Sequence, residues 1–490
     1  MSGIVKLGLR QGLLAGAVAL SGCAFAPPTR PPAMPEPAHY AADAATATST
    51  SVAGDMQTFA RAAPVVPAWW HAFGSATLDG WVDEGLRNNP SLDAARHTLE
   101  AVHQQYRAQV GDTLLPSVDA QGQASRQRAL GLPNLGPPTS LYNVYAGQLN
   151  LDYRFDLFGA DRYGVKRAAA QLDAQAHQLA AARRALAANI VITAIEASAA
   201  AEQVQAAARS VTLANTHAEL VARAYALGAA SHDDLLNARQ SAATLATTLP
   251  ALRTRAIQAR HALAVYLGRT PDQAPEVLPL ADFQLPPSVP VSVPSDLLRQ
   301  RPDVLAAEAD LRAASAQVGV ATANMFPHLS LSASLGSAAF KDAALFASGS
   351  KIWSVGLGLT QPIFHGGALR AERKAAIAEY DASVAQYRQT VLNAFRNVAD
   401  SLVALQQDAA ASKAAGVAAD TAKQSFDETR ARARLGAASH PEQIASEQHW
   451  QQTRQLEIQS TAAQLTDTAA LLQAMGEPST DAAGAGVAPR

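Results

Sequence analysis

The chain has 490 residues and a formal net charge of −2, because 39 Lys and Arg side chains nearly balance 41 Asp and Glu. This length exceeds that of one ordinary compact domain, and the near-neutral charge argues against a nucleic-acid-binding surface. Only 16% of the residues are charged and 48% are hydrophobic, with Ala supplying much of the apolar fraction. The single cysteine excludes a disulfide framework and a cysteine-based metal cluster.

The N-terminus has the pattern of a secretory signal. Lys6 and Arg10 form a basic region before a short apolar run over 12–20, which is too short to span a bilayer. The run ends in Leu20-Ser21-Gly22-Cys23, which resembles a bacterial lipobox. That resemblance implies cleavage before Cys23, a diacylglycerol on its thiol and an acyl chain on its new amino group.

The segment after the cysteine is expected to be an extended linker, because residues 24–67 are rich in Pro, Ala, Ser and Thr. Ala24, and not an Asp, directly follows Cys23, so sorting to the outer membrane is expected by analogy with enterobacterial lipoproteins. Beyond residue 25 we expect no apolar stretch of about 18 residues, and therefore no membrane-spanning helix.

The rest of the chain is a tandem duplication. Residues 227–232 (LGAASH) recur verbatim at 435–440, an offset of 208. Four more landmarks keep their order at offsets between 206 and 212, namely 86–90 with 298–302, Leu115-Pro116 with Phe326-Pro327, Leu157-Phe158 with Ile363-Phe364, and Leu267-Gly268 with Met475-Gly476. Because chance does not place five landmarks in order at a nearly constant spacing, the repeat is about 208 residues long.

Each copy predicts the same elements in the same order. They are a helix (78–111 and 295–324), two strands (117–128 and 141–155, then 328–340 and 351–362), a long helix (164–226 and 368–433) and a shorter helix (233–267 and 441–475). The strands are predicted from strict alternation, as in Leu329, Leu331 and Leu335 between serines. Transmembrane barrel strands require such alternation, although a half-buried strand of a soluble sheet shows it too.

The predicted lengths constrain the architecture. Long helices of 63 and 66 residues would extend roughly 95 to 100 Å, which is typical of coiled-coil arrays and not of a compact domain. Four strands cannot close a barrel by themselves, since about eight is the smallest number that can. The chain is therefore expected to oligomerise, and a trimer would supply 12 strands.

Together, the lipobox, the duplicated unit and Phe155-Asp156-Leu157-Phe158-Gly159 resemble the outer-membrane efflux factors. These are the TolC-like and OprM-like proteins, here in the lipoprotein branch labelled NodT, and the resemblance covers about 70–478. It implies a mainly α fold with a membrane β-barrel, in which a trimeric 12-stranded β-barrel continues into a periplasmic α-helical barrel. The implied organisation is a lipoprotein signal peptide (1–22), a lipidated linker (23–68), repeat one (69–271), a Pro-rich linker (272–294), repeat two (295–478) and a tail (479–490).

The resemblance also implies a function, which is that of a passive exit duct in the outer membrane. Drugs or toxic organic molecules would reach it from an inner-membrane pump of the resistance-nodulation-division type through a periplasmic adaptor. No cofactor is expected, apart from the lipid attached to Cys23. Besides the pump and the adaptor, the lipid of the outer membrane is an expected partner. No G-x-S-x-G, H-E-x-x-H or Walker pattern is present, so no catalytic residue and no metal ligand is assigned.

Two alternatives stay open from the sequence. One is a duct of the same fold that serves type I protein secretion. The other is a lipid-anchored periplasmic coiled-coil adaptor without a pore, although two symmetric pairs of strands argue against it.

The resemblance places adaptor docking and pore closure at the two helix–turn–helix tips. The residues there are Arg223, Tyr225, Leu227, Gly228, Ser231, Arg432, Leu435, Gly436 and Ser439. Helix capping by the Gly and Ser residues is a complete alternative explanation for them. Many members carry Asp nine residues after the second Gly, but here that position is Ala445 and its counterpart in the first copy is Asn237. The nearby Asp233, Asp234 and Glu442 are therefore the candidate aperture acids.

Overall fold

The computed structural model describes residues 25–29, 32, 49–50, 56–61, 67–130, 139–291 and 300–476. The expected signal peptide, Cys23, the start of the second-copy helix at 295 and the tail at 479–490 lie outside them. The chain divides into two compact units. One unit comprises Met1–Ala33, Thr98–Ala176 and Ala306–Arg388, and the other comprises Met34–His97, His177–Leu305 and Gln389–Arg490.

The first helix of copy one is broken in two. Helix α2 covers Ala76–Asn88 and α3 covers Pro90–Leu114, so the prediction of one continuous helix over 78–111 was wrong. The break lies at Asn89, whose ψ of 121° is extended because a proline disfavours the helical conformation of the preceding residue. The Asn89 side chain then starts α3, since its Oδ1 accepts a 2.9 Å hydrogen bond from the Ser91 N–H. In copy two, α7 (Pro302–Ala323) also begins at a proline.

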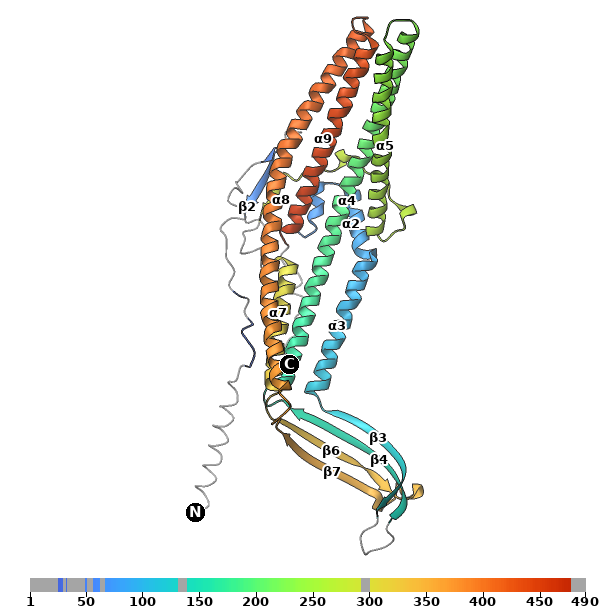
Figure 1. The fold of residues 1–490 in the computed structure, drawn as a ribbon. Helices are drawn as coiled ribbons and strands as arrows, with labels where there is room; N and C mark the ends of the chain where they lie inside the picture. The colour runs from blue at the N-terminus through green and yellow to red at the C-terminus, as the bar shows by residue number, and fades with distance from the viewer. Residues whose placement is uncertain are drawn as a thin grey trace. The chain divides into compact units, whose positions relative to one another are not determined.

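Each copy then contains a helix of 67 residues and a helix of 35 residues. The long helices are α4 (Ala160–Ala226) and α8 (Ala368–Arg434), and the shorter ones are α5 (His232–Tyr266) and α9 (His440–Ala474). Figure 1 shows α4 with α5, and α8 with α9, as antiparallel hairpins. Gly159 and Gly367, directly before the long helices, have φ of 87° and 85°, a conformation that favours glycine.

Helix α4 contains an apolar stretch that the sequence analysis overlooked. An 18-residue window in it has a mean hydropathy of 1.3, so the expectation that no such stretch follows residue 25 was wrong. However, 67% of that window is buried inside the structure. Ile190, Val191 and Ile195 of α4 are fully buried. The stretch therefore forms protein core.

Helix α9 packs against both long helices of its unit. The ring of Trp450 in α9 stacks on Phe426 of α8, with centroids 5.5 Å apart. On another face of α9, the Glu447 carboxylate forms an ion pair with the guanidinium of Arg209 of α4, with an N–O distance of 2.6 Å. Glu447 is only 7% exposed. These contacts fix the register of α9 between its neighbours.

The regions expected to be linkers contribute a small sheet. Strands β1 (Ser49–Thr50), β2 (Met56–Arg61) and β5 (Ser288–Val291) pair in the order β1-β2-β5, with β2 and β5 parallel. Val289 of β5 is fully buried. Gln57 of β2 donates a 3.4 Å hydrogen bond to Thr468 of α9. These two segments, 230 residues apart in the chain, are therefore ordered by each other and by α9. These strands are too short for an alternation of apolar and polar residues to predict them from the sequence.

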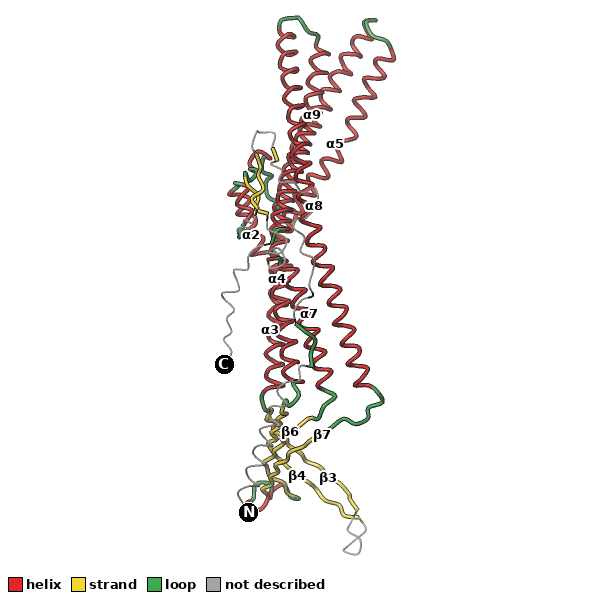
Figure 2. The backbone as a smooth tube through the Cα atoms, turned by 90° about the vertical axis from the view of Figure 1, so that its left-hand side faces the viewer, coloured by secondary structure: helices red, strands yellow, loops and turns green. Residues whose placement is uncertain are grey.

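The four long strands form a second sheet, which Figure 2 shows as yellow stretches of the backbone tube. They are β3 (Ser117–Leu130), β4 (Thr139–Phe155), β6 (His328–Ala339) and β7 (Lys351–Thr360). Their order is β3-β4-β6-β7, and every neighbouring pair is antiparallel. Thus β3 and β7 are the two edge strands of this sheet.

Candidate functional site: one sheet and two helical turns

The four-stranded sheet gathers its apolar side chains on one face. One apolar row crosses all four strands, because the registers align Val118, Leu151, Ala333 and Val355. Neighbouring rows on this face hold Ala120, Leu149, Leu335 and Trp353, then Tyr153, Leu331 and Leu357, then Phe155, Leu329 and Leu359. Trp353 and Leu359 are 74% and 68% exposed. Such a broad exposed apolar surface indicates contact with lipid or with another protein.

The opposite face of the sheet is polar and lined with small residues. The Oγ atoms of Ser334 and Ser354 lie 2.8 Å apart across β6 and β7. Asn150 of β4 donates a 3.3 Å hydrogen bond to Gln121 of β3. The sheet therefore has one apolar and one polar face, which is the pattern of transmembrane barrel strands.

The junction between β4 and α4 is tightly connected. Arg154 of β4 makes two 3.0 Å hydrogen bonds to the carboxylate of Asp161, which is 7% exposed at the start of α4. Next to this pair, Phe158 stacks on Phe326, with ring centroids 5.0 Å apart. Phe25 reaches the same place, 4.8 Å from the Phe326 ring. The segment that follows Cys23 therefore lies against the end of the sheet.

The two LGAASH segments form matching turns between the helices. The Gly228 N–H donates to Tyr225 O at 3.0 Å, and the Ala229 N–H donates to Ala224 O at 2.8 Å. In the second copy, the Gly436 and Ala437 N–H groups make the equivalent bonds at the same two distances. Both glycines have φ of 75°, as the position after a helix end favours.

The predicted tip residues differ in what they contact. Leu227 and Leu435 are 85% and 84% exposed, and each stands at the same position of its turn. Tyr225 lies near His232, with ring centroids 5.5 Å apart. Arg223 lies in the last turn of α4, where its carbonyl accepts from the Leu227 N–H, and Arg432 donates to Thr429 of its own helix. The two leucines are therefore the apolar groups that the turns present to solvent.

Two of the three candidate aperture acids are engaged in helix caps. The Ser231 hydroxyl accepts from the Asp234 N–H, and the Asp234 carboxylate accepts from the Ser231 N–H, each at 3.0 Å. Ser439 and Glu442 form the same capping box in the second turn, with the Ser439 N–H donating to Glu442 at 2.7 Å. These hydrogen bonds hold the pKa of Asp234 and of Glu442 below the usual range. Asp233 makes no such bond within the described residues.

A pair of carboxylates escaped the sequence analysis. Asp408 of α8 faces Asp467 of α9, and burial, a hydrogen bond to Asp467 and its charge raise the pKa of Asp408 to about 7. Two carboxylates can share a hydrogen bond only while one carries a proton. The sequence does indicate this pair. Asp408 lies 27 residues before the start of the second LGAASH segment, and Asp467 lies 27 residues after its end. Equal distances from a turn place two residues side by side in an antiparallel hairpin.

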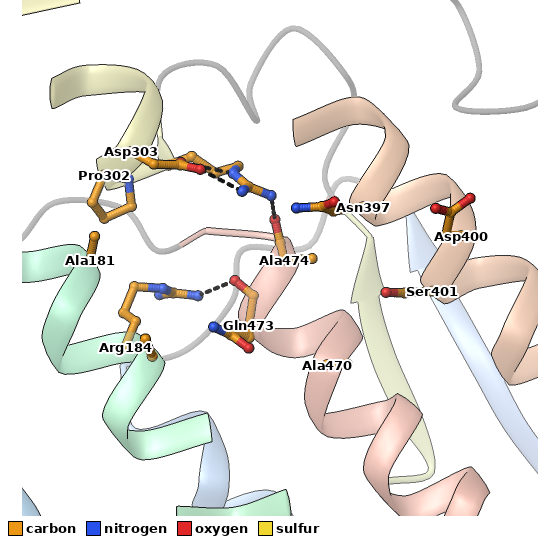
Figure 3. Close-up of a pocket in the computed structure, with 12 residues that line it drawn as sticks. Ala181, Arg184, Pro302, Asp303, Asn397, Asp400, Ser401, Ala470, Gln473 and Ala474 are labelled. Carbon is orange, nitrogen blue, oxygen red and sulfur yellow. Dashed lines mark hydrogen bonds and ion pairs between the residues drawn. The ribbon is translucent and has the colours of Figure 1, made fainter. Parts of the chain in front are cut away.

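Two arginines hold the C-terminal end of α9, beside a pocket of about 490 Å³ (Figure 3). Arg184 of α4 donates to the carbonyls of Leu472 and Gln473, and Arg301 donates to that of Ala474 at 3.0 Å. Cations are favourable at this end of a helix. Although burial would raise the pKa of Asp303, its hydrogen bonds from Arg301 hold that pKa below the usual value. Among the described residues, no three His, Cys, Asp or Glu side chains are grouped to hold a metal ion.

Known proteins are similar to this chain both in sequence and in fold. The family model "Outer membrane efflux protein" matches residues 81–269 and 293–477, one match for each repeat. The outer membrane protein OprJ of Pseudomonas aeruginosa is 33% identical over 413 residues, covering 77% of this chain and 83% of OprJ. The solvent efflux pump outer membrane protein SrpC of Pseudomonas putida is 33% identical over 393 residues, covering 79% and 80%.

Among solved structures, that of a membrane protein from Pseudomonas aeruginosa superposes with a TM-score of 0.77 at 28% identity. The match covers 93% of this chain and 100% of that protein. The mainly helical fold with a four-stranded sheet is also that of the MtrE outer membrane channel of Neisseria gonorrhoeae, with a TM-score of 0.72 at 26% identity over 92% of this chain and 98% of MtrE. On these grounds, the chain belongs to the outer membrane efflux protein family.

Proposed function

We propose that this chain is the subunit of a trimeric exit duct that conducts small molecules across the outer membrane. The single observation that carries the proposal is the two-faced sheet, whose apolar rows cross all four strands while its edge strands stay unpaired in one chain. An exposed sheet edge cannot stand in a bilayer, because its N–H and C=O groups would lack partners. Three copies would close a barrel of 12 strands and remove every edge.

In this proposal the substrate is a small organic molecule, supplied by a periplasmic adaptor and an inner-membrane pump of the resistance-nodulation-division type. The relative SrpC is by name the outer membrane protein of a solvent efflux pump, which supports this substrate class. The adaptor would contact the two turns, where Leu227 and Leu435 offer exposed apolar groups at equivalent positions. Docking of a partner would cover both leucines.

The proposal includes a lipid anchor on Cys23. Support comes from the lipobox-like sequence 20–23 and from the position of Phe25, which lies against Phe326 at the end of the sheet. An acylated residue two positions earlier would then be close to the level of the membrane. Two or more acyl chains give a stable anchor where one does not.

The decisive experiment is to purify the full chain from outer-membrane fractions in mild detergent and to image it as single particles. We expect three-fold particles with a rod of about 100 Å, the length of a 67-residue helix. Conductance in planar bilayers then tests for an open path, and efflux assays in a strain that lacks its own duct test the substrate class. A monomeric particle, or release from the membrane without detergent, would overturn the duct.

A further inference from the structure

The four-stranded sheet has one end that joins the helices and one end that does not. Helices α3 and α7 lead into β3 and β6, and strands β4 and β7 lead into α4 and α8. The opposite end of the sheet, here called the outer end, comprises residues 123–130, 139–146 and 337–351. In the duct proposed above, on which this inference rests, the helices cross the periplasm, so the outer end lies at the cell surface.

The outer end is rich in positive charge. Its basic residues are Arg126, Arg128, Lys341 and Lys351. All four side chains are exposed, and none forms an ion pair with another described residue. The only acid in these three ranges is Asp342, whose carboxylate accepts a 2.8 Å hydrogen bond from the Ala343 N–H. This excess of cations favours an anionic partner.

The two arginines lie on the apolar face of the sheet. The register of β3 with β4 is unbroken, and Arg126 and Arg128 lie an even number of residues from Val118, which belongs to an apolar row. Because side chains alternate along a strand, all three point to one side. On the polar face, Gln127 donates a 3.1 Å hydrogen bond to Tyr142, as this alternation requires.

The two lysines lie on the same face as the arginines. Lys351 begins β7, two residues before Trp353 of an apolar row. Lys341 follows Phe340, whose ring lies 5.6 Å from that of Tyr142 on the polar face. The backbone of Lys341 is extended, with φ of −130° and ψ of 138°, so its side chain points to the apolar face.

The basic residues begin where the apolar rows end. Trp353 is in the last apolar row of β7, and aromatic residues border the apolar band of transmembrane barrels. Lys351 is one row further out, beyond that border. In the proposed duct this is the level of the lipid headgroups in the outer leaflet of the outer membrane.

A depression adjoins these groups on the apolar face. The registers align Gly122, Gly147, Ser337 and Lys351 in one row. Together with Phe346 from the β6–β7 connection, which is 89% exposed, this row lines a cavity of about 660 Å³.

The chain itself does not require the two glycines of this depression. Neither Gly122 nor Gly147 has a positive φ, and a Cβ atom at either position would meet no atom within 4 Å. Glycine weakens a strand interior, and there it often marks a place where a ligand approaches closely. The missing side chains therefore leave room for a group from outside the chain.

We propose that the outer end of the apolar face binds a phosphorylated lipid of the outer leaflet. The basic side chains bind its phosphate groups, and the depression beside Phe346 takes the upper part of an acyl chain. Arg126 and Arg128 have Cα atoms about 7 Å apart, so one phosphate can contact both guanidinium groups. Arg binds phosphate through paired hydrogen bonds. The apolar rows that adjoin the site favour a lipid over a soluble anion.

Native mass spectrometry of the full-length protein in mild detergent tests the site. We expect bisphosphorylated lipid A, a glycolipid of bacterial outer membranes, to stay bound. Lipid A that lacks one phosphate should bind about tenfold more weakly, because charge-assisted hydrogen bonds are lost. Inorganic phosphate in excess should not displace the lipid, since it has no acyl chain for the depression. Displacement by phosphate would mean that the site binds a free anion, and would overturn the proposal.

A matched pair of double variants tests the arginines. Arg126→Gln with Arg128→Gln should weaken binding of bisphosphorylated lipid A about tenfold. The control, Arg370→Gln with Lys374→Gln, removes the same two charges from exposed positions at the start of α8. It should bind the lipid as the unchanged protein does. Equal weakening in both variants would show a general attraction to charge and would overturn the site.

Gly147→Val tests the depression without a change of charge. Val is favourable in strands and its Cβ has free space here, so this variant should fold. It should lose bound lipid faster than the unchanged protein, because the new side chain fills the depression. Lipid binding that is unchanged in this variant would overturn the placement of the acyl chain.

The failure of this inference can be told apart from the failure of the duct. If three-fold particles conduct ions but bind both forms of lipid A equally, the lipid site is wrong and the duct stands. If the unmodified chain forms no three-fold particle, the duct itself is wrong, and with it the position of the outer end in the membrane.

Discussion

The carboxylate of Asp408 on α8 faces that of Asp467 on α9, each 27 residues from the LGAASH segment that joins the two helices. The pair keeps a proton at a pH where an ordinary Asp has lost it. Because two neighbouring carboxylates repel when both are charged, the packing of α8 on α9 is most favourable while that proton is held.

Replacing Asp408 should therefore change how stability depends on pH. Burial and Asp467 raise its pKa from 3.8 to about 7. Between these values the unfolded chain releases the proton and the folded chain holds it, so the free energy of unfolding falls as the pH rises through this window. Asp408→Asn removes this decrease in the free energy of unfolding, because the amide does not titrate. Allowing for solvent around the half-exposed pair, we expect a gain of about 1 kcal/mol at pH 8 and none at pH 4.

Thermal unfolding followed by circular dichroism at pH 4, 6 and 8 measures this effect. The control Asp381→Asn changes an exposed residue of the same helix and should leave the pH profile as it is. An equal shift at all three pH values would show that proton sharing is not the cause.

The two faces of β7 should respond in opposite ways to a charge. Val355 lies on the apolar face opposite Ala333, and Ser354 lies on the polar face opposite Ser334. Val355→Arg should impair insertion into the outer membrane, because an Arg on the lipid face of a barrel costs about 2–4 kcal/mol near the bilayer centre. Ser354→Arg should insert normally. The amount of protein in outer-membrane fractions compares them, and equal yields would contradict the assignment of the faces.

The two neighbouring acids of the first turn should have separate effects. Asp234 is held in the capping box of Ser231, whereas Asp233 has no such bond within the described residues. Asp234→Asn should lower helix stability with little change in single-channel conductance. Asp233→Asn should lower cation selectivity if the turns border the aperture. If both variants conduct and select ions as the unchanged protein does, the acids serve the helix ends alone.

Removal of a serine cap should weaken one turn without altering its charge. Ser439→Ala should cost about 1 kcal/mol, because the Glu442 N–H loses its acceptor. Hydrogen exchange at the start of α9 should then rise, with the first turn of α5 as the internal control. Unchanged protection would mean that the capping box contributes little there.

Loss of the proposed acylation site should remove the lipid without removing the fold. Cys23→Ser should abolish incorporation of labelled palmitate, while the helical content stays the same. Labelling that persists in this variant would mean that the acyl group is attached elsewhere.

The sequence predicted the helical class and the family, because duplicated landmarks and long Ala-rich helices are patterns that a single chain displays. The break at Asn89 was missed because the helical pattern continues on both sides of it, whereas Pro90 acts only on the conformation of the residue before it. The pairing of β2 with β5 was missed because it joins segments far apart in the chain, and six residues carry too little alternation. The turn residues could be placed, since Gly and Ser at fixed positions encode a helix end and a cap locally.

The duplication also bears on how the proposed trimer would form. The 11 residue pairs from Tyr145–Ala339 to Phe155–Leu329 join the two copies within one chain. Two partners in one chain meet at an effective concentration that the connecting segment sets, whatever the concentration of the protein. Half of the six joints between sheet units would thus be formed before any two chains meet, and dilution would affect only the other three. A single-repeat ancestor would have had to form all six by collision.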